Sequence, residues 1–131
     1  MILLDTHAWI WWLTEPKKLS AKAADRIRRS EKASQVGIAS ISCWEVAMLV
    51  AKGRLGLSFD VEEWIEKSLK LTEVRLLDLT PKIAILSTRL PGNPPADPAD
   101  RLLIATAKIH GCPIISRDRE ISNYRDVETL W

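Results

Sequence analysis

Short apolar runs alternate along this chain with longer segments of helical periodicity. The runs that we predict as strands are residues 1–5, 36–40, 74–79 and 112–118, with residues 126–131 as a candidate fifth strand. Between them, the spacing of apolar residues predicts helices over residues 6–16, 19–35, 42–56, 59–71, 80–90 and 97–111. Strands separated by helices favour an α/β fold, in which helices cover both faces of a mostly parallel sheet of four to five strands.

The ends of the predicted helices carry residues that commonly cap or stop a helix. The candidate N-caps are Ser20, Asp60, Thr80 and Asp97. Proline, which is favoured at the first helical position, follows Thr80 and Asp97, so Asp97 is interpreted more readily as a cap than as a ligand. Gly53 and Gly111 are expected to end two helices. No linker is long enough to divide the chain, and residues 1–131 are expected to form a single domain.

The composition is that of an ordinary globular protein, with 47% apolar and 27% charged residues. Cys43 and Cys112 lack the spacing of metal ligands and are expected to be reduced, buried thiols. The N-terminal stretch has no basic region and contains Asp5, which argues against a signal peptide. The apolar stretches are too short to span a bilayer. We therefore expect a cytoplasmic protein without a membrane contact.

Positive charge is concentrated in one segment. Residues 17–32 contain seven basic and two acidic side chains, a balance of +5 in a chain whose net charge is +2. Two interpretations stay open at this point. The segment, with Arg26, Arg28 and Arg29, forms a helix that holds an anionic polymer, or it forms a solvated helix face with no partner.

Four acids lie beside the predicted strand ends. Asp5 and Asp118 end two of the strands, and Glu45 and Asp100 lie one turn inside two of the helices. Ligand sites in parallel sheets gather at the carboxyl ends of the strands, so these carboxylates are expected to converge there. Clustered carboxylates repel one another unless they are protonated or bind cations, and their oxygens suit Mg²⁺ or Mn²⁺. Two such ions can activate a water against a phosphodiester.

Each of these acids also has a structural interpretation. Asp5 can end a strand at a turn, with Thr6 as a candidate helix cap. Ser42 and Glu45 fit a capping box, in which the glutamate would reach back to the backbone amide of its cap. Asp118 can be an acid of a surface turn. The sequence leaves these alternatives open.

Other enzyme chemistries find little support in the sequence. The chain has no glycine-rich phosphate loop, which argues against a P-loop or a dinucleotide site. His7 and His110 have no serine or cysteine nucleophile pattern around them, and we interpret both as structural. Asp5 is not followed two residues later by the second aspartate of an aspartyl-phosphate phosphatase.

Four stretches match a known set of motifs in their order and near their spacing. They are LLDTHAWIWWL, ASISCWEVAMLVAKGRL, DPADRLLIATA and IISRD. Together they resemble the PIN domain, specifically the VapC-type ribonuclease toxins of toxin–antitoxin pairs, and the similarity spans essentially the whole chain. The resemblance implies a three-layer α/β/α sandwich. It also implies that the metal-binding and catalytic acids are Asp5, Glu45, Asp100 and Asp118.

The resemblance extends to residues around these acids. Ser116 matches a Ser/Thr position beside the last acid, where a hydroxyl can hold a carboxylate or a water, and Thr6 is expected to support the site. Asp97 matches an additional aspartate that is common in this subgroup. Ala99 stands where the subgroup usually has an aromatic residue, a departure that removes no ligand.

The resemblance implies an Mg²⁺- or Mn²⁺-dependent endoribonuclease that acts on single-stranded or looped RNA. It implies a homodimer and inhibition by a small antitoxin protein whose tail covers the cleft. The basic helix would then contact phosphates of the RNA that flank the cleaved bond. Two alternatives remain: a PIN-fold nuclease of RNA maturation or DNA repair, and a non-catalytic PIN-fold module that binds a partner. The absence of an added nucleic-acid-binding domain argues against the first, and the intact acids argue against the second.

Overall fold

The computed structural model describes residues 1–71 and 73–131. The elements follow in the order β1 (Ile2–Leu4), α1 (Thr6–Thr14), the short 3₁₀ helix η1 (Pro16–Lys18), α2 (Ala21–Lys32), β2 (Val36–Ala39), α3 (Ser40–Ala51), α4 (Val61–Leu71), β3 (Arg75–Leu77), α5 (Pro81–Ser87), α6 (Pro98–His110), β4 (Ile114–Ile115), α7 (Arg119–Ser122) and β5 (Thr129–Leu130). The predicted alternation of strands and helices is confirmed. The sequence pattern did not predict η1 and α7.

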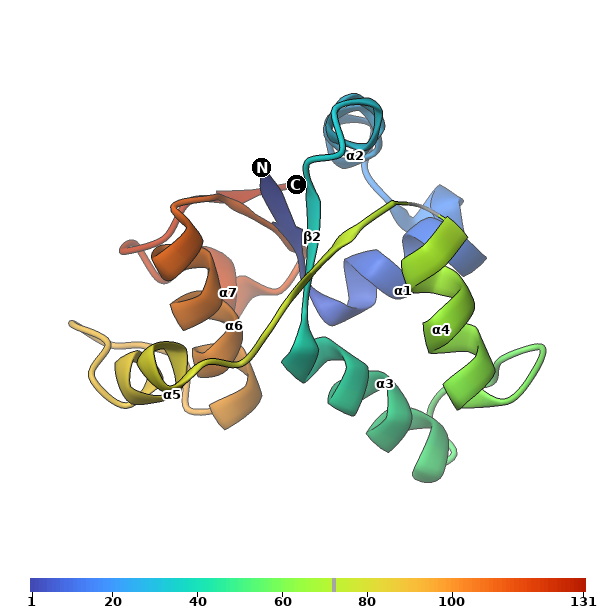
Figure 1. Ribbon diagram of the computed structural model, residues 1–131. Coiled ribbons are helices and arrows are strands. Elements are labelled where there is room, and N and C mark those ends of the chain that lie inside the picture. Colours follow the sequence, from blue (N-terminus) through green and yellow to red (C-terminus); the bar gives the residue numbers. More distant parts are fainter. Residues whose placement is uncertain (72) are drawn as a thin grey trace.

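The strands form one five-stranded sheet in the order β3-β2-β1-β4-β5. All four neighbouring pairs are parallel, with β1 at the centre between β2 and β4. The chain therefore winds outward from β1 in both directions, first to β2 and β3 and then back across to β4 and β5 (Figure 1). The predicted α/β sandwich with a parallel central sheet is confirmed.

Helices cover both faces of the sheet, so the molecule has three layers. Figure 1 shows α1, α3 and α4 on one side and α5, α6 and α7 on the other. The alternation of side chains along β1 divides the core accordingly, because successive residues of a strand point to opposite faces. Ile2 and Leu4 pack in the core with α1, α2 and α4, whereas Leu3 packs in the core with α6.

Local capping sets the helix ends much as the sequence predicted. Ser20 Oγ accepts a hydrogen bond from the Ala23 amide at 3.0 Å, and Thr80 Oγ1 accepts one from the Ile83 amide at 3.2 Å. Gly111 ends α6 with a left-handed backbone (φ 62°), a conformation that glycine adopts without a steric penalty. These local contacts fix where the helices start, and hence which residues reach the edges of the sheet.

Cys43 and Cys112 are both free thiols, as predicted, but only Cys112 is buried; the prediction of a buried Cys43 is wrong, because this side chain of α3 is partly exposed. Burial raises the pKa of each, so both stay protonated at neutral pH. Within the described part of the chain, no helix combines the length and the apolar character needed to cross a membrane.

Candidate active site

The carboxyl ends of β1 and β4 lie beside the N-termini of α1 and α7. Asp5 follows β1 directly and caps α1, because its Oδ1 accepts a hydrogen bond from the Ala8 amide at 2.7 Å. The alternative in which Thr6 caps the helix is wrong, since Thr6 is already the first helical residue. Asp5 is only 6% exposed.

Glu45 faces the same region from α3, and the capping-box interpretation is wrong. The helix begins at Ser40 with Ala39 as its N-cap, three residues before the Ser42 cap that the box requires, and no side chain caps it. The Thr6 hydroxyl instead donates a hydrogen bond to Glu45 Oε1 at 2.9 Å. Ser42 Oγ lies 3.1 Å from the same hydroxyl and is buried. A hydroxyl from α1 thus anchors a carboxylate from α3.

The start of α6 contributes two acids with different local roles. Asp97 is the N-cap, as predicted, and its Oδ1 accepts a hydrogen bond from the Ala99 amide at 2.8 Å. Asp100 is the third residue of the helix and lies in its first turn. The cap is therefore satisfied by Asp97 alone, which leaves the Asp100 carboxylate free to face the neighbouring acids.

Ser116 and Asp118 follow β4. The Ser116 hydroxyl donates a hydrogen bond to Asp5 Oδ2 and accepts one from the Asp118 amide at 3.0 Å. Asp118 is not merely an acid of a surface turn, because its Oδ1 accepts a hydrogen bond from the Glu120 amide at 2.7 Å and caps α7. Ser116, buried at the strand end, therefore connects the loops that carry two of the predicted acids.

All of the predicted acids line one cavity of about 140 Å³. The lining residues are Asp5, Thr6, His7, Glu45, Asp97, Asp100, Leu103, Asp118 and Ile121. Four helices begin around this cavity, and the positive ends of their dipoles partly offset the concentrated negative charge. The structure thus brings together acids that are up to 113 positions apart in the sequence.

The pKa values of three of these carboxyls are raised. Burial is the main cause for Asp5, whose pKa the Ser116 hydrogen bond lowers in opposition. Burial also raises the pKa of Glu45, while the Thr6 hydrogen bond lowers it. The pKa of Asp100 rises to about 7, first through burial and then through repulsion by Asp97 and Asp118. The cavity therefore favours either protonation or the binding of a cation.

The donor set of the cavity is hard oxygen, the type that Mg²⁺ and Mn²⁺ prefer. Within residues 1–71 and 73–131, however, no group of three or more histidine, cysteine, aspartate or glutamate side chains lies close enough to hold a metal ion. The carboxylates line the cavity as separate groups, which their mutual repulsion favours. The residue types fit a hard cation, and a cation would have to draw them together.

His7 and Ser42 belong to this site, although the sequence did not single them out as functional. His7 is exposed and lines the cavity, so it is not part of the core. Its charge lowers the pKa of Asp5 and Glu45, in opposition to the effect of burial. The sequence signal that could have identified His7 was its position in the first turn of α1, the helix that Asp5 caps.

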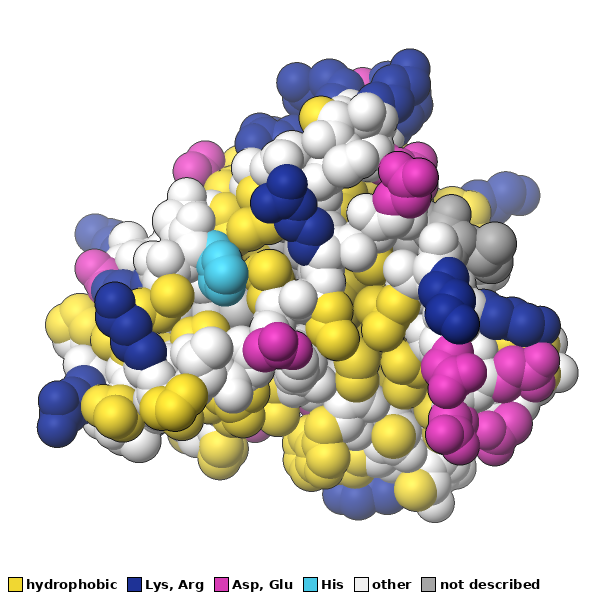
Figure 2. All heavy atoms as spheres, viewed as in Figure 1, with side chains coloured by type: hydrophobic (Ala, Val, Ile, Leu, Met, Phe, Trp, Pro, Cys, Tyr) yellow, Lys and Arg dark blue, Asp and Glu magenta, His cyan; other side chains and the backbone are white. Residues whose placement is uncertain are grey.

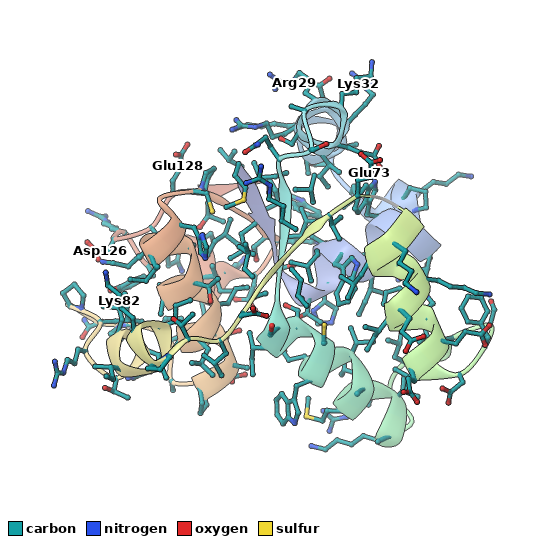
Figure 3. All side chains as sticks on the ribbon, viewed as in Figure 1. Arg29, Lys32, Glu73, Lys82, Asp126 and Glu128 are labelled. Atoms are coloured by element: carbon teal, nitrogen blue, oxygen red, sulfur yellow. The ribbon has the colours of Figure 1, made fainter. Side chains whose placement is uncertain are left out.

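The basic helix α2 lies elsewhere. Figure 1 shows it beside the start of β2, whereas α3 begins at the other end of that strand, where the acids lie. Lysine and arginine side chains gather over α2, and Arg29 and Lys32 project from it away from the sheet (Figures 2 and 3). Asp25 on the same helix pairs with Arg28 and, at 3.0 Å, with Arg29. Part of the positive charge is thus neutralised within the helix.

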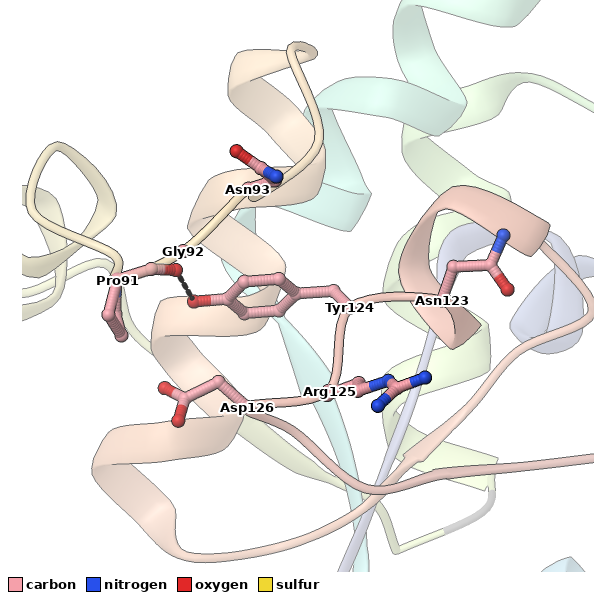
Figure 4. Close-up of a pocket in the computed structure, with 7 residues that line it drawn as sticks. All are labelled: Pro91, Gly92, Asn93, Asn123, Tyr124, Arg125 and Asp126. Atoms are coloured by element: carbon pink, nitrogen blue, oxygen red, sulfur yellow. Dashed lines mark hydrogen bonds between the residues drawn. The ribbon is translucent and has the colours of Figure 1, made fainter.

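A larger cavity of about 450 Å³ lies between the loop before α6 and the loop after α7. Tyr124 Oη donates a hydrogen bond to the Pro91 carbonyl at 2.7 Å across it (Figure 4). Its one carboxylate, Asp126, pairs with Lys108. This cavity therefore offers no cluster of acids, and the chemistry-bearing residues lie in the smaller one.

The chain is similar to known proteins in sequence and in structure. The model of the PIN domain matches residues 2–127. The chain is 36% identical over 132 residues to Ribonuclease VapC22 of Mycobacterium tuberculosis. The alignment covers 99% of this chain and 98% of that protein.

Two solved structures share the fold. The structure of VapBC2 from Rickettsia felis bound to a promoter DNA fragment superposes with a TM-score of 0.71 at 14% identity. The match covers 99% of this chain and 98% of the VapBC2 chain. The structure of FitAcB from Neisseria gonorrhoeae has a TM-score of 0.68 at 22% identity. The match covers 100% of this chain and 97% of the FitAcB chain.

Proposed function

The chain belongs to the PIN-domain family, and on that premise we propose that it is the endoribonuclease toxin of a VapC-type toxin–antitoxin pair. We further propose that residues 1–131 form a single domain and that RNA cleavage depends on Mg²⁺ or Mn²⁺. The observation that carries the proposal is the cavity into which α1, α3, α6 and the β4–α7 loop each bring an acid.

Asp5, Glu45, Asp100 and Asp118 are the residues that would hold the metal. A bound Mg²⁺ or Mn²⁺ supplies an activated water and offsets charge on the phosphate under attack. The raised pKa values support this assignment, because a cation would relieve the burial and repulsion that now disfavour the charged carboxylates. Asp97 both caps α6 and lies in the cavity, where its charge adds to the attraction for a cation.

Two hydroxyls position the acids. Ser116 fixes one oxygen of Asp5 while the Ala8 amide holds the other, so this carboxylate keeps its orientation when its charge changes. Thr6 holds Glu45 at 2.9 Å and thereby ties α3 to α1. Both hydroxyls favour the charged carboxylate, so they oppose the rise in pKa that burial causes.

We propose RNA as the substrate and a cognate antitoxin protein as the partner, in the cytoplasm. The relative VapC22 is a ribonuclease by name, and the solved neighbours include a toxin–antitoxin complex from Klebsiella pneumoniae. The arginines of α2 would bind distant phosphates of a long RNA rather than the bond that is cut, because this helix lies at the other end of the sheet (Figure 1).

We propose a homodimer on the basis of exposed apolar side chains. Large hydrophobic residues that a monomer would leave in water are Trp44, Leu76, Leu79 and Ile85, with exposed fractions between 45% and 55%. Figure 2 shows hydrophobic side chains gathering over the region of α3 and α5. Exposed apolar side chains that gather on one face commonly mark a protein interface.

The test is cleavage of single-stranded RNA by the purified chain, with EDTA, Mg²⁺ or Mn²⁺ added. We expect cleavage with metal and none with EDTA. Glu45→Gln should remove most activity without lowering the melting temperature, whereas the control Glu66→Gln, at an exposed position of α4, should leave cleavage unchanged. Near-normal cleavage by Glu45→Gln would refute the metal-binding role.

Expression without a partner provides an independent test in cells. The wild-type chain should arrest growth, and Asp5→Asn should be harmless. Equal toxicity of both would point to partner binding or aggregation. Cleavage of DNA in preference to RNA would favour the alternative of a repair nuclease.

A further inference from the structure

A second cavity, of about 350 Å³, adjoins the acid-lined cavity. Its lining residues are Asp5, His7, Trp11, Arg117 and Asp118. Three of them also line the acid-lined cavity, so the two spaces share a wall. The second space has more than twice the volume of the first, and it is within the range of known small-molecule sites, which begins at about 300 Å³. We call this second space the Trp11 pocket.

One wall of the Trp11 pocket is aromatic. Trp11 lies one turn after His7 on α1, and the two rings are 5.7 Å apart. Trp131 packs edge-on against Trp11 at 5.9 Å, which holds the indole in place. Trp11 nevertheless stays partly exposed, unlike Trp9 in the core of the same helix. A fixed and partly exposed indole beside a polar cavity is a surface on which a flat ring can stack.

Arg117 supplies a cation to the Trp11 pocket, beside the carboxylates of Asp5 and Asp118. Arg117 is exposed and precedes Asp118, and it makes no ion pair with any residue that the structure describes. Lys18 Nζ lies 5.7 Å from the centre of the Trp11 ring, but it pairs with Glu15 at 3.3 Å, so Arg117 is the cation that this pocket offers to a ligand. The pocket therefore combines carboxylates, an aromatic face and an unpaired guanidinium within one space. A nucleotide has matching parts, since its base stacks and its phosphate pairs with a guanidinium.

We propose that the Trp11 pocket holds the RNA nucleotide next to the scissile phosphate, with its base stacked on Trp11 and its outer phosphate paired with Arg117. This inference rests on the proposed function, because the acids must first place the scissile phosphate. The wall that the two cavities share determines where each part of the RNA lies. The scissile phosphate lies over Asp5 and Asp118, and the base of the adjoining nucleotide enters the Trp11 pocket beside them. Stacking is tolerant of base identity, so the pocket favours unpaired RNA over a duplex without selecting a single base.

The first test measures RNA affinity in the cleavage-inactive Asp100→Asn background, by fluorescence anisotropy with a short single-stranded RNA. Trp11→Leu keeps an apolar side chain but removes the ring face, and affinity should fall at least about fivefold, the factor for ~1 kcal/mol of stacking. Trp11→Phe keeps a ring and should retain most of the affinity. The control Phe59→Leu removes a ring that is 41% exposed and contacts Lys67 instead. Equal affinity of Trp11→Leu and its parent, with both folded, would overturn the proposal.

An abasic scan of the RNA locates the contact. A single abasic residue is placed at each position in turn, and the affinities of the parent and of Trp11→Leu are compared. At the position next to the cleaved bond the two should bind equally, because the base that Trp11 would contact is missing. At all other positions the difference should persist. A difference that persists at every position would refute the stacking contact.

Arg117→Gln tests the phosphate contact. The slope of log affinity against log salt should flatten by roughly 0.7, the value for one phosphate contact to a single strand. Arg54→Gln, an exposed arginine after α3, is the matched control and should leave the slope unchanged. An unchanged slope for Arg117→Gln would contradict this part of the proposal.

Failure of the inference is distinguishable from failure of the proposed function. If the wild-type chain cleaves no RNA, the proposed function fails. If it cleaves RNA and Trp11→Leu in the native chain does so with unchanged KM, only the pocket assignment fails. If Trp11→Leu weakens the antitoxin complex but not RNA binding, the pocket is a protein contact and the inference is overturned.

Discussion

Replacing Asp100 with asparagine should stabilise the metal-free protein. The carboxyl of Asp100 is partly buried beside Asp97, Asp118 and Glu45, and its pKa rises from 3.8 to about 7. Each pKa unit corresponds to 1.36 kcal/mol, so the full shift sets an upper limit of about 4 kcal/mol. The group is partly solvated and salt screens its neighbours, which reduces the expected gain to about 1–2 kcal/mol. Asparagine has nearly the same shape but carries no charge.

The sign of the pH dependence follows from the raised pKa. Between about pH 4 and pH 7 the folded protein holds a proton on Asp100 that the unfolded chain has released, so the stability of the wild type falls as the pH rises through this window. Asparagine does not titrate. The advantage of Asp100→Asn should therefore be complete above pH 7 and should vanish below about pH 4.

The assay is thermal unfolding followed by circular dichroism, in EDTA, at several pH values from 4 to 8. At pH 7.5 the melting temperature of the variant should exceed that of the wild type by about 3–5 °C per kcal/mol. Asp78→Asn, at an exposed position after β3, is the control and should change little. Added Mn²⁺ should stabilise the wild type more than the variant, because a bound ligand shifts the folding equilibrium. A variant that is less stable at pH 7.5 in EDTA, or equally stabilised by Mn²⁺, would refute the reasoning.

Three further changes test other contacts. Ser116→Ala removes the hydroxyl donor to the buried Asp5 and should lower the free energy of unfolding by about 1–3 kcal/mol at pH 7 but less at pH 4, as measured in urea. Thr6→Val removes the hydrogen bond that lowers the pKa of Glu45, so the acidic limb of the pH–rate profile should move to higher pH, while Thr6→Ser should restore it. A triple change in α2 replaces Arg26, Arg28 and Arg29 with glutamine. It should flatten the slope of log RNA affinity against log salt by up to about 2 and leave kcat unchanged. An unaltered slope would exclude α2 from RNA binding.

The sequence predicted the architecture because the relevant signals are local. A short apolar run is recognisable as a buried strand, and a serine, threonine or aspartate before a periodic segment caps a helix through an amide only two or three residues away. Ser20, Thr80 and Asp97 all act in this way. The convergence of the four acids was predicted as well, since the edge at which parallel strands end follows from the fold class alone.

Tertiary contacts decided what the individual side chains do. Glu45 matched a local capping box, but the N-cap of α3 lies three residues before Ser42, and the hydrogen-bond donor for Glu45 is Thr6, 39 positions away. Ser116 and Asp5 are 111 positions apart and meet only because β1 and β4 are neighbours in the sheet. The placement of α2 away from the acids and of Trp11 beside them likewise depends on how the helices pack. Hydrogen-bond partners and pKa shifts come from groups that are close in space, and the sequence specifies that closeness only through the complete fold.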